Sequence, residues 1–169
     1  MVLDRPAPRS SAAGSVVSGR SIPDNLKHIA RVQELMQKVV GDLIKRACCH
    51  DRSKLVSPEL EGFDQSPPLG TIVYGSPEYA KSCDDLKPTL EHHYAHNDHH
   101  PEWSSSGIKG MNLLQLVELV CDWKASSERH PGGNVFNSIE SNQERFGYSD
   151  ELKKILHQTA VFLQDYPLG

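Results

Sequence analysis

The stretch NLLQLVELVCDWKASSERH, residues 112–130, predicts an amphipathic helix and decides the fold class. Asn112 precedes the first apolar residues, and its side chain suits the N-cap of a helix. Apolar residues then recur at helical spacing, so this helix is expected to bury one side against other helices. The apolar residues are Leu113, Leu116, Val117 and Val120, and the polar stripe holds Gln115, Glu118, Asp122, Ser126 and Arg129.

The same periodicity extends outward in both directions. Upstream, a helix is expected to start at residues 21–24, to break at Gly41-Asp42 and to continue towards Cys48. Further helices are expected after Pro88, over residues 138–145 and after Ser149, whereas residues 56–79 are expected to form a loop with a turn of helix. No strand pattern reaches a convincing length. The prediction is therefore an all-α chain, with a compact single-domain helical bundle over residues 21–169 and a disordered tail over residues 1–20.

Composition excludes several classes of protein. The 169 residues contain no run of 18 apolar residues, and the first 20 lack the apolar core of a secretory signal. The four cysteines are too few for a disulfide scaffold of this length, and we expect a soluble cytoplasmic protein without a membrane partner. The net charge of −4 and the absence of a basic run argue against bulk nucleic-acid binding. An anionic ligand would need a metal or a local cation to hold it.

Histidine is enriched in one short segment. The chain has nine histidines, and five of them fall within residues 92–100. Such a cluster is typical of a metal site or of a site for a polyanion. The simpler alternative is an exposed polar loop.

The string CCHDRSKL, residues 48–55, carries the most informative pair of side chains. His50 and Asp51 offer an imidazole nitrogen beside a carboxylate oxygen, a combination that suits Mn, Fe, Co, Ni or Zn. Further ligands have to converge on this pair. His28, which lies 22 residues upstream, and Asp122, which lies 71 residues downstream of Asp51, are the candidates.

Helix geometry sets a condition on His28. In one continuous helix, His28 and His50 would lie roughly 33 Å apart and could not bind one ion. A turn near Gly41 would let them meet across a helical hairpin. The assignment of His28 therefore requires a break near Gly41.

The ordered set His28, His50-Asp51 and Asp122 resembles the HD superfamily of metal-dependent phosphohydrolases, which is all-helical. Lys54 matches the lysine of the superfamily's frequent His-Asp-x-Gly-Lys string, with Ser53 in place of the glycine. A closer resemblance is to a family of short bacterial and phage HD-like proteins. These share an HD-x-SK string and a His-His-x3-Asn-x-His-His block, which here comprises His92, His93, Asn97, His99 and His100.

The resemblance implies a metal-dependent hydrolase of a phosphomonoester or phosphodiester, with a nucleotide as the expected substrate class. It implies that metal-activated water attacks phosphorus and that the protein takes one divalent transition metal, or two. The implied metal ligands are His28, His50, Asp51 and Asp122, with His93 for a second metal. The implied catalytic residues are Lys54, His99 and His100. The implied substrate-binding residues are Lys54, His92, His96 and Asn97.

Simpler interpretations and other functions remain open at this point. Asp122 could face solvent with its polar stripe, His28 could be a surface residue, and His50-Asp51 could end one helix and cap the next segment. The HD resemblance also covers di-iron oxygenases with additional histidines. A third class is a non-catalytic module that binds or sequesters a ligand. The predicted partners are a small phosphorylated substrate and, through the 112–130 helix, a second copy in a homodimer.

Overall fold

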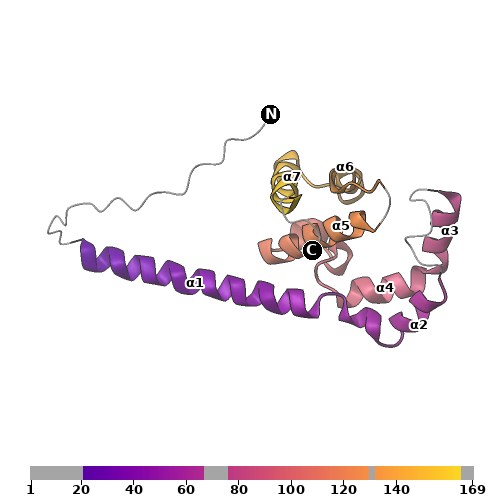
Figure 1. Ribbon diagram of the computed structural model, residues 1–169, viewed down its shortest axis with the longest axis horizontal. Coiled ribbons are helices and arrows are strands. Elements are labelled where there is room, and N and C mark those ends of the chain that lie inside the picture. Colours follow the sequence, from indigo (N-terminus) through magenta and orange to yellow (C-terminus); the bar gives the residue numbers. More distant parts are fainter. Residues whose placement is uncertain (1–20, 67–75, 130–131, 165–169) are drawn as a thin grey trace. The chain divides into compact units, whose positions relative to one another are not determined.

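The computed structural model describes residues 21–66, 76–129 and 132–164, and their regular elements are α-helices and short 3₁₀-helices (Figure 1). No strand occurs in these ranges, so the predicted all-α class is confirmed. Residues 1–20, where a tail was expected, lie outside the described part of the chain. The elements are α1 (Ile22–Cys49), η1 (Arg52–Leu55), α2 (Glu59–Asp64), α3 (Pro77–Asp85), α4 (Lys87–His96), η3 (Pro101–Trp103), η4 (Gly107–Gly110), α5 (Leu113–Glu128), α6 (Val135–Phe146) and α7 (Asp150–Gln164).

Helix α1 crosses the boundary between two units of the chain, residues 1–38 and 39–169. It continues through Gly41 without interruption, so the break expected at Gly41-Asp42 is wrong. A glycine inside a helix costs only about 1 kcal/mol relative to alanine. Arg46 Nε lies 3.0 Å from Asp42 Oδ2, one helical turn away, and this ion pair supports the helix just after the glycine.

The core of the second unit is formed by the last three helices. Helices α5, α6 and α7 pack against one another (Figure 1). Leu119 of α5 and Ile139 of α6 are completely buried, and Ala160 of α7 closes the core from the third side. Asn112 caps α5 as predicted, because its side chain accepts hydrogen bonds from the backbone N–H groups of Leu114 and Gln115. This core holds α5 in place, and α5 carries part of the site described below.

A second group of elements lies around α4. Helix α2 contacts both η1 and α4, and α3 contacts α4. Gly62 of α2 lies so close to Thr89 of α4 that a Cβ atom at position 62 would overlap the threonine side chain. The glycine therefore permits the close approach of the two helices, which brings the first turn of α2 to the histidines of α4.

The remaining helix predictions are mostly correct. Helices α4 and α7 occur where they were expected, and α6 is longer than the predicted 138–145. Helix α3 was not predicted, because residues 56–79 were interpreted as mainly loop. The apolar part of that stretch, residues 71–74, lies outside the described residues. Within the described ranges, no helix has both the length and the apolar character needed to cross a membrane.

Candidate metal centre

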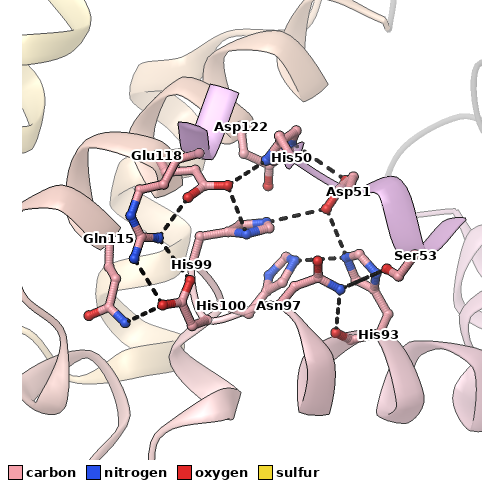
Figure 2. Close-up of polar contacts among 12 residues, drawn as sticks. His50, Asp51, Ser53, His93, Asn97, His99, His100, Gln115, Glu118 and Asp122 are labelled. Atoms are coloured by element: carbon pink, nitrogen blue, oxygen red, sulfur yellow. Dashed lines mark hydrogen bonds and ion pairs between the residues drawn. The ribbon is translucent and has the colours of Figure 1, made fainter. Parts of the chain in front are cut away.

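Four segments of the second unit bring histidine and carboxylate side chains together (Figure 2). Each segment is part of a helix or directly follows one, and the helix fixes the position of its side chains. The α1–η1 junction contributes His50 and Asp51, α4 contributes His93, the α4–η3 connection contributes His99 and His100, and α5 contributes Glu118 and Asp122.

Asp51 lies at the centre of this cluster. It is the N-cap of η1, and its backbone adopts the left-handed conformation with φ 53° and ψ 20°. Aspartate tolerates this conformation better than most residues, although it still costs free energy. The sharp turn after α1 places the Asp51 carboxylate between the histidines of α4 and α5's acidic side chains (Figure 2).

The first oxygen of Asp51 faces buried imidazole nitrogens. Asp51 Oδ1 lies 3.2 Å from His93 Nε2 and 3.4 Å from His99 Nε2. Both histidines are almost fully buried, and neither Asp51 Oδ1 nor His99 Nε2 has a hydrogen-bond partner. Unpaired buried polar atoms are costly, so atoms that converge in this way fit a bound cation.

His100 completes this first group. Its Nε2 lies 3.0 Å from His93 Nε2, and one ligand atom from each of Asp51, His93, His99 and His100 falls within 4.8 Å of the others. Burial, reinforced by His99 and His93, lowers the pKa of His100 to about 3. His100 is therefore neutral near pH 7, and a neutral imidazole is the form that binds metal.

The second oxygen of Asp51 faces a second group. Asp51 Oδ2 lies 3.5 Å from His50 Nε2, which in turn lies 3.6 Å from Asp122 Oδ1. Hydrogen bonding to Asp122 raises the pKa of His50 to about 9. Burial disfavours the charged form of Asp122, but the contact with His50 together with the charges of His100 and His99 lowers the Asp122 pKa. The two oxygens of Asp51 thus belong to two adjoining sets of candidate ligands.

Glu118 orients two of these histidines from behind. Its Oε1 accepts a hydrogen bond from His50 Nδ1 at 2.9 Å and lies 3.2 Å from His99 Nδ1. Because a carboxylate can only accept, His50 carries a proton on Nδ1. The Nε2 atoms of His50 and His99 both face Asp51. Glu118 Oε2 is bound by Arg46 at 2.9 Å. We therefore interpret Glu118 as an outer carboxylate that positions the ligands, an arrangement common around metal sites.

Arg46 ties the end of α1 to the histidine segment. Its guanidinium donates two hydrogen bonds to Asp98, at 2.8 and 3.0 Å, besides its bond to Glu118. Gln115 of α5 also donates to Asp98, at 2.9 Å. The bond to Asp98 is the main reason why the Arg46 pKa is raised, so this cation is permanent. The network fixes Asp98, the residue that precedes His99.

Glu59 orients the histidines of α4 in the same manner. It is completely buried, and its Oε2 accepts hydrogen bonds from His93 Nδ1 and from Ser53 Oγ, each at 2.8 Å. Its Oε1 accepts from His92 Nδ1 at 2.8 Å. Burial opposes ionisation of Glu59, yet the hydrogen bonds from His92, Ser53 and His93 lower its pKa. With Nδ1 held by Glu59, His93 Nε2 is directed at Asp51.

Lys54 lies at the rim of the cluster. Its Nζ donates to Asp51 Oδ2 at 2.5 Å and lies 5.6 Å from the centre of the Phe63 ring. Burial opposes ionisation of Asp51, but its contacts with His93 and Lys54 and the charges of Lys54 and His50 hold the Asp51 pKa well below its usual range. Lys54 therefore contacts the central carboxylate while its side chain stays partly exposed.

The predicted substrate-binding residues have different surroundings. Asn97 Nδ2 donates to Ser53 Oγ at 2.9 Å and to the backbone oxygen of His93 at 2.8 Å. His92 is bound to Glu59, and His96 donates from Nδ1 to the His92 backbone oxygen while its ring stacks on that of His92. Asn97 thus supports the site internally, whereas His92 and His96 lie on its partly exposed side.

Comparison with known proteins identifies the family. Residues 19–166 match the sequence model described as "Family of unknown function (DUF5662)". The chain belongs to DUF5662. Neither the curated proteins nor the solved structures contain a match to it.

In this DUF5662 chain, most of the candidate metal ligands named from the sequence lie in the cluster. The residues that hold those ligands in place were not named as such. His50, Asp51, His93 and Asp122 come together as expected, and His99 and His100 join them. The assignment of His28 as a ligand required a break near Gly41, and α1 does not break there. Glu59 and Arg46 were missed entirely, and Glu118 was noted only as part of the polar stripe of residues 112–130. The spacing of four residues between Glu118 and Asp122 places both on one face of α5, which was the available signal.

Proposed function

We propose that this protein is a metal-dependent hydrolase of the HD type that acts on a small phosphate ester. One observation carries the proposal. If Glu59 holds His93 as a neutral Nδ1–H imidazole, the His93 Nε2 lone pair faces Asp51 Oδ1 across 3.2 Å, and the unpaired Nε2 of His99 lies 3.4 Å from the same oxygen. Atoms that face one another in this way are satisfied by a metal ion or a proton between them, and three imidazoles around one carboxylate favour the metal ion. The HD resemblance suggests that the cation is a catalytic metal.

The donor set favours a borderline transition metal. Imidazole nitrogens and carboxylate oxygens suit Mn, Fe, Co, Ni and Zn better than Mg or Ca. Asp51, His93, His99 and His100 would hold one ion, and His50, Asp51 and Asp122 could hold a second. Asp51 would then be the bridging ligand, because its two oxygens belong to different sets.

The metal would supply a water of lowered pKa and would polarise a phosphoryl oxygen. The chain's own residues have separable tasks around it. Lys54, bound to Asp51 and partly exposed, is placed to donate a hydrogen bond to a phosphoryl oxygen of the substrate. His92 and His96 offer further imidazoles at the rim. The low pKa of His100 argues for a ligand rather than a proton donor, and the burial of His99 argues the same.

The first test is the metal content of protein purified without a histidine tag. We expect about one or two equivalents of a transition metal, and release of phosphate from a panel of phosphate esters. Asp51→Ala and Asp122→Ala should lose the metal while keeping the helical circular dichroism spectrum. Lys54→Ala should keep the metal and lose turnover. Full metal in both aspartate variants, or full turnover in Lys54→Ala, would contradict the proposal.

A di-iron oxygenase is the second candidate, because Asp51 belongs to both sets of candidate ligands. A carboxylate shared by two sets of imidazole and carboxylate groups also suits a pair of irons. Two irons per chain with an optical absorption, together with oxygen consumption and no phosphate release, would support this candidate. Ligand affinity without turnover, unchanged in His50→Ala, would instead indicate a non-catalytic binding module.

In either hydrolase or oxygenase, we place the reaction in the cytoplasm, since all four cysteines are free.

A further inference from the structure

A cavity of about 400 Å³, open to solvent along the exposed residues Ala47, Val117, Cys121 and Ala125, adjoins the candidate metal centre within the second unit. It lies between the last turns of α1 and one face of α5, and its volume is in the range of small-molecule sites. The wall is formed mainly by small or apolar side chains, namely Leu43, Ala47, Val117, Cys121 and Ala125. A cavity of this kind next to a reactive centre suggests where the rest of a substrate lies.

The polar residues of the cavity wall differ in what they can still bind. Arg46 is occupied by Asp42, Asp98 and Glu118, and Glu118 is occupied by Arg46 and two histidines. His50 and Asp122 are the other polar residues that line the cavity, and both belong to the second set of candidate metal ligands. A ligand in the cavity would therefore meet polar recognition only at the His50–Asp122 end.

The approach to the metal centre is consistent with this arrangement. The side chains of His50 and Asp122 are 31% and 23% exposed, whereas those of His93 and His99 are each 2% exposed. The cluster is thus accessible from the cavity at His50 and Asp122, whereas His93 and His99 are covered. A substrate that reaches the cluster from the cavity would leave its non-reacting part against Ala47 and Val117.

We propose that the site takes an ester whose organic part is a hydrocarbon group, and that this group lies in the cavity between α1 and α5. The proposal rests on the proposed function for the phosphate end and narrows its substrate class. A nucleoside would present several hydroxyl and ring donors and acceptors, and the cavity wall away from the metal centre leaves them unpaired. A hydrocarbon group has no such cost and gains from burial.

The test is a binding series that does not depend on turnover. The full-length protein, loaded with Mn²⁺, is titrated calorimetrically with methylphosphonate and then with ethyl-, butyl- and hexylphosphonate. Burial of each methylene should tighten binding by about fourfold until the cavity is filled. A second arm measures binding of 1-hexanol, which has no anionic group, by ligand-observed NMR.

Two variants fill the cavity, and one serves as a matched control. Ala47 and Ala125 are exposed helical positions of the cavity wall, so Ala47→Phe and Ala125→Phe should fold and should each abolish the gain with chain length. Ala95 is an exposed alanine of α4 outside the cavity, and Ala95→Phe should keep the full gain. Circular dichroism checks that each variant folds.

The outcomes separate this proposal from the proposed function. Methylphosphonate binding with no gain along the series overturns the hydrocarbon proposal and leaves the phosphate site standing. Hexanol binding that is lost in Ala47→Phe, without any phosphonate binding, supports the cavity and overturns phosphate chemistry at this centre. Failure of both ligands to bind overturns both.

Discussion

At the scale of single residues, the site depends on carboxylates with two different tasks. Asp51 and Asp122 face the Nε2 atoms of histidines, where a metal would lie. Glu59 and Glu118 instead accept from Nδ1 atoms and so decide which nitrogen of each imidazole is free. The inner carboxylates supply charge to a cation, while the outer ones fix the tautomer and direction of its ligands.

Glu59→Gln tests directly whether an outer carboxylate fixes the tautomer and direction of a histidine ligand. The amide has nearly the same size, but it replaces a buried anion that accepts from His92, His93 and Ser53 with a neutral group. His93 should then lose its fixed tautomer, and the affinity for metal should fall by about 10- to 100-fold. Competition with a chromophoric chelator measures this change.

The control for this variant is Glu61→Gln, which makes the same change at an exposed position of the same helix. Its metal affinity should match that of the wild type. Equal affinity in Glu59→Gln and the wild type would show that His93 does not need Glu59 to act as a ligand.

Sequence patterns identify residues that have a local signature and miss those that do not. His50-Asp51 and the histidine block are local strings, so they could be recognised without the fold. Glu59 lies six residues after Ser53 in a stretch interpreted as loop, and its importance arises only because Gly62 lets α2 approach α4. Such a tertiary contact leaves no periodicity in the sequence.

At the scale of elements, α5 joins the core to the site. Its apolar side is buried in the core with α6 and α7, while Gln115, Glu118 and Asp122 recur on the other side at spacings of three and four. Because α5 is one helix, its packing in the core also fixes the position of Glu118 and Asp122 in the candidate metal centre. The sequence predicted this helix and its cap correctly because both signals are local.

Removal of the cap should measurably weaken α5. In the capping box, Asn112 accepts from backbone N–H groups while the Gln115 side chain accepts from the Asn112 N–H. Asn112→Ala should lower the free energy of unfolding by about 1 kcal/mol, as followed by urea denaturation. Asn112→Ser retains a capping oxygen and should lose much less. Equal stabilities of Asn112→Ala and the wild type would contradict a stabilising cap.

Tyr148 links α6 to the core and predicts a pH dependence. Its buried hydroxyl donates to the backbone oxygen of Ile139, and burial raises the Tyr148 pKa to about 12. The unfolded tyrosine titrates near 10. Between these values the unfolded state has lost a proton that the folded state keeps, so the stability contributed by Tyr148 falls as pH rises from about 10 to 12.

Tyr148→Phe isolates this contribution. At pH 8 the variant should be less stable than the wild type by about 1 kcal/mol, because the Ile139 carbonyl loses its donor. The difference between the two proteins should shrink as pH rises towards 11, as measured by urea denaturation at each pH. A difference that stays constant up to pH 11 would refute the raised pKa.

The continuity of α1 illustrates a limit of prediction at this scale. Gly41-Asp42 has the composition of a break, but the helix formers around it and the Asp42–Arg46 pair maintain the helix. A local composition signal of about 1 kcal/mol is easily overruled by its neighbours. The consequence reaches the site, because the His28 hypothesis depended on that break.

At the scale of the whole molecule, the centre joins segments that are distant in the sequence. Residues 50–51, 93–100 and 118–122 meet there, although other packing within the second unit involves mainly α5–α7 on one side and the α2–α4 group on the other. A metal bound to all of them would cross-link these groups in the folded state only. Binding to the folded state alone stabilises it by mass action, by about 2.7 kcal/mol at a free metal concentration of 100 Kd.

Metal removal should therefore lower the thermal stability of the protein. We expect dialysis against a chelator to reduce Tm, as followed by circular dichroism at 222 nm, and re-addition of the native metal to restore it. Asp122→Ala lacks one candidate ligand of the second set, so its Tm should depend less on metal. The control is Asp64→Ala, which changes an exposed aspartate of α2 outside the cluster and should respond as the wild type does. Unpaired buried atoms such as Asp51 Oδ1 and His99 Nε2 destabilise the metal-free state. A Tm that is identical with and without saturating metal would therefore mean that protons, rather than a metal, satisfy this cluster.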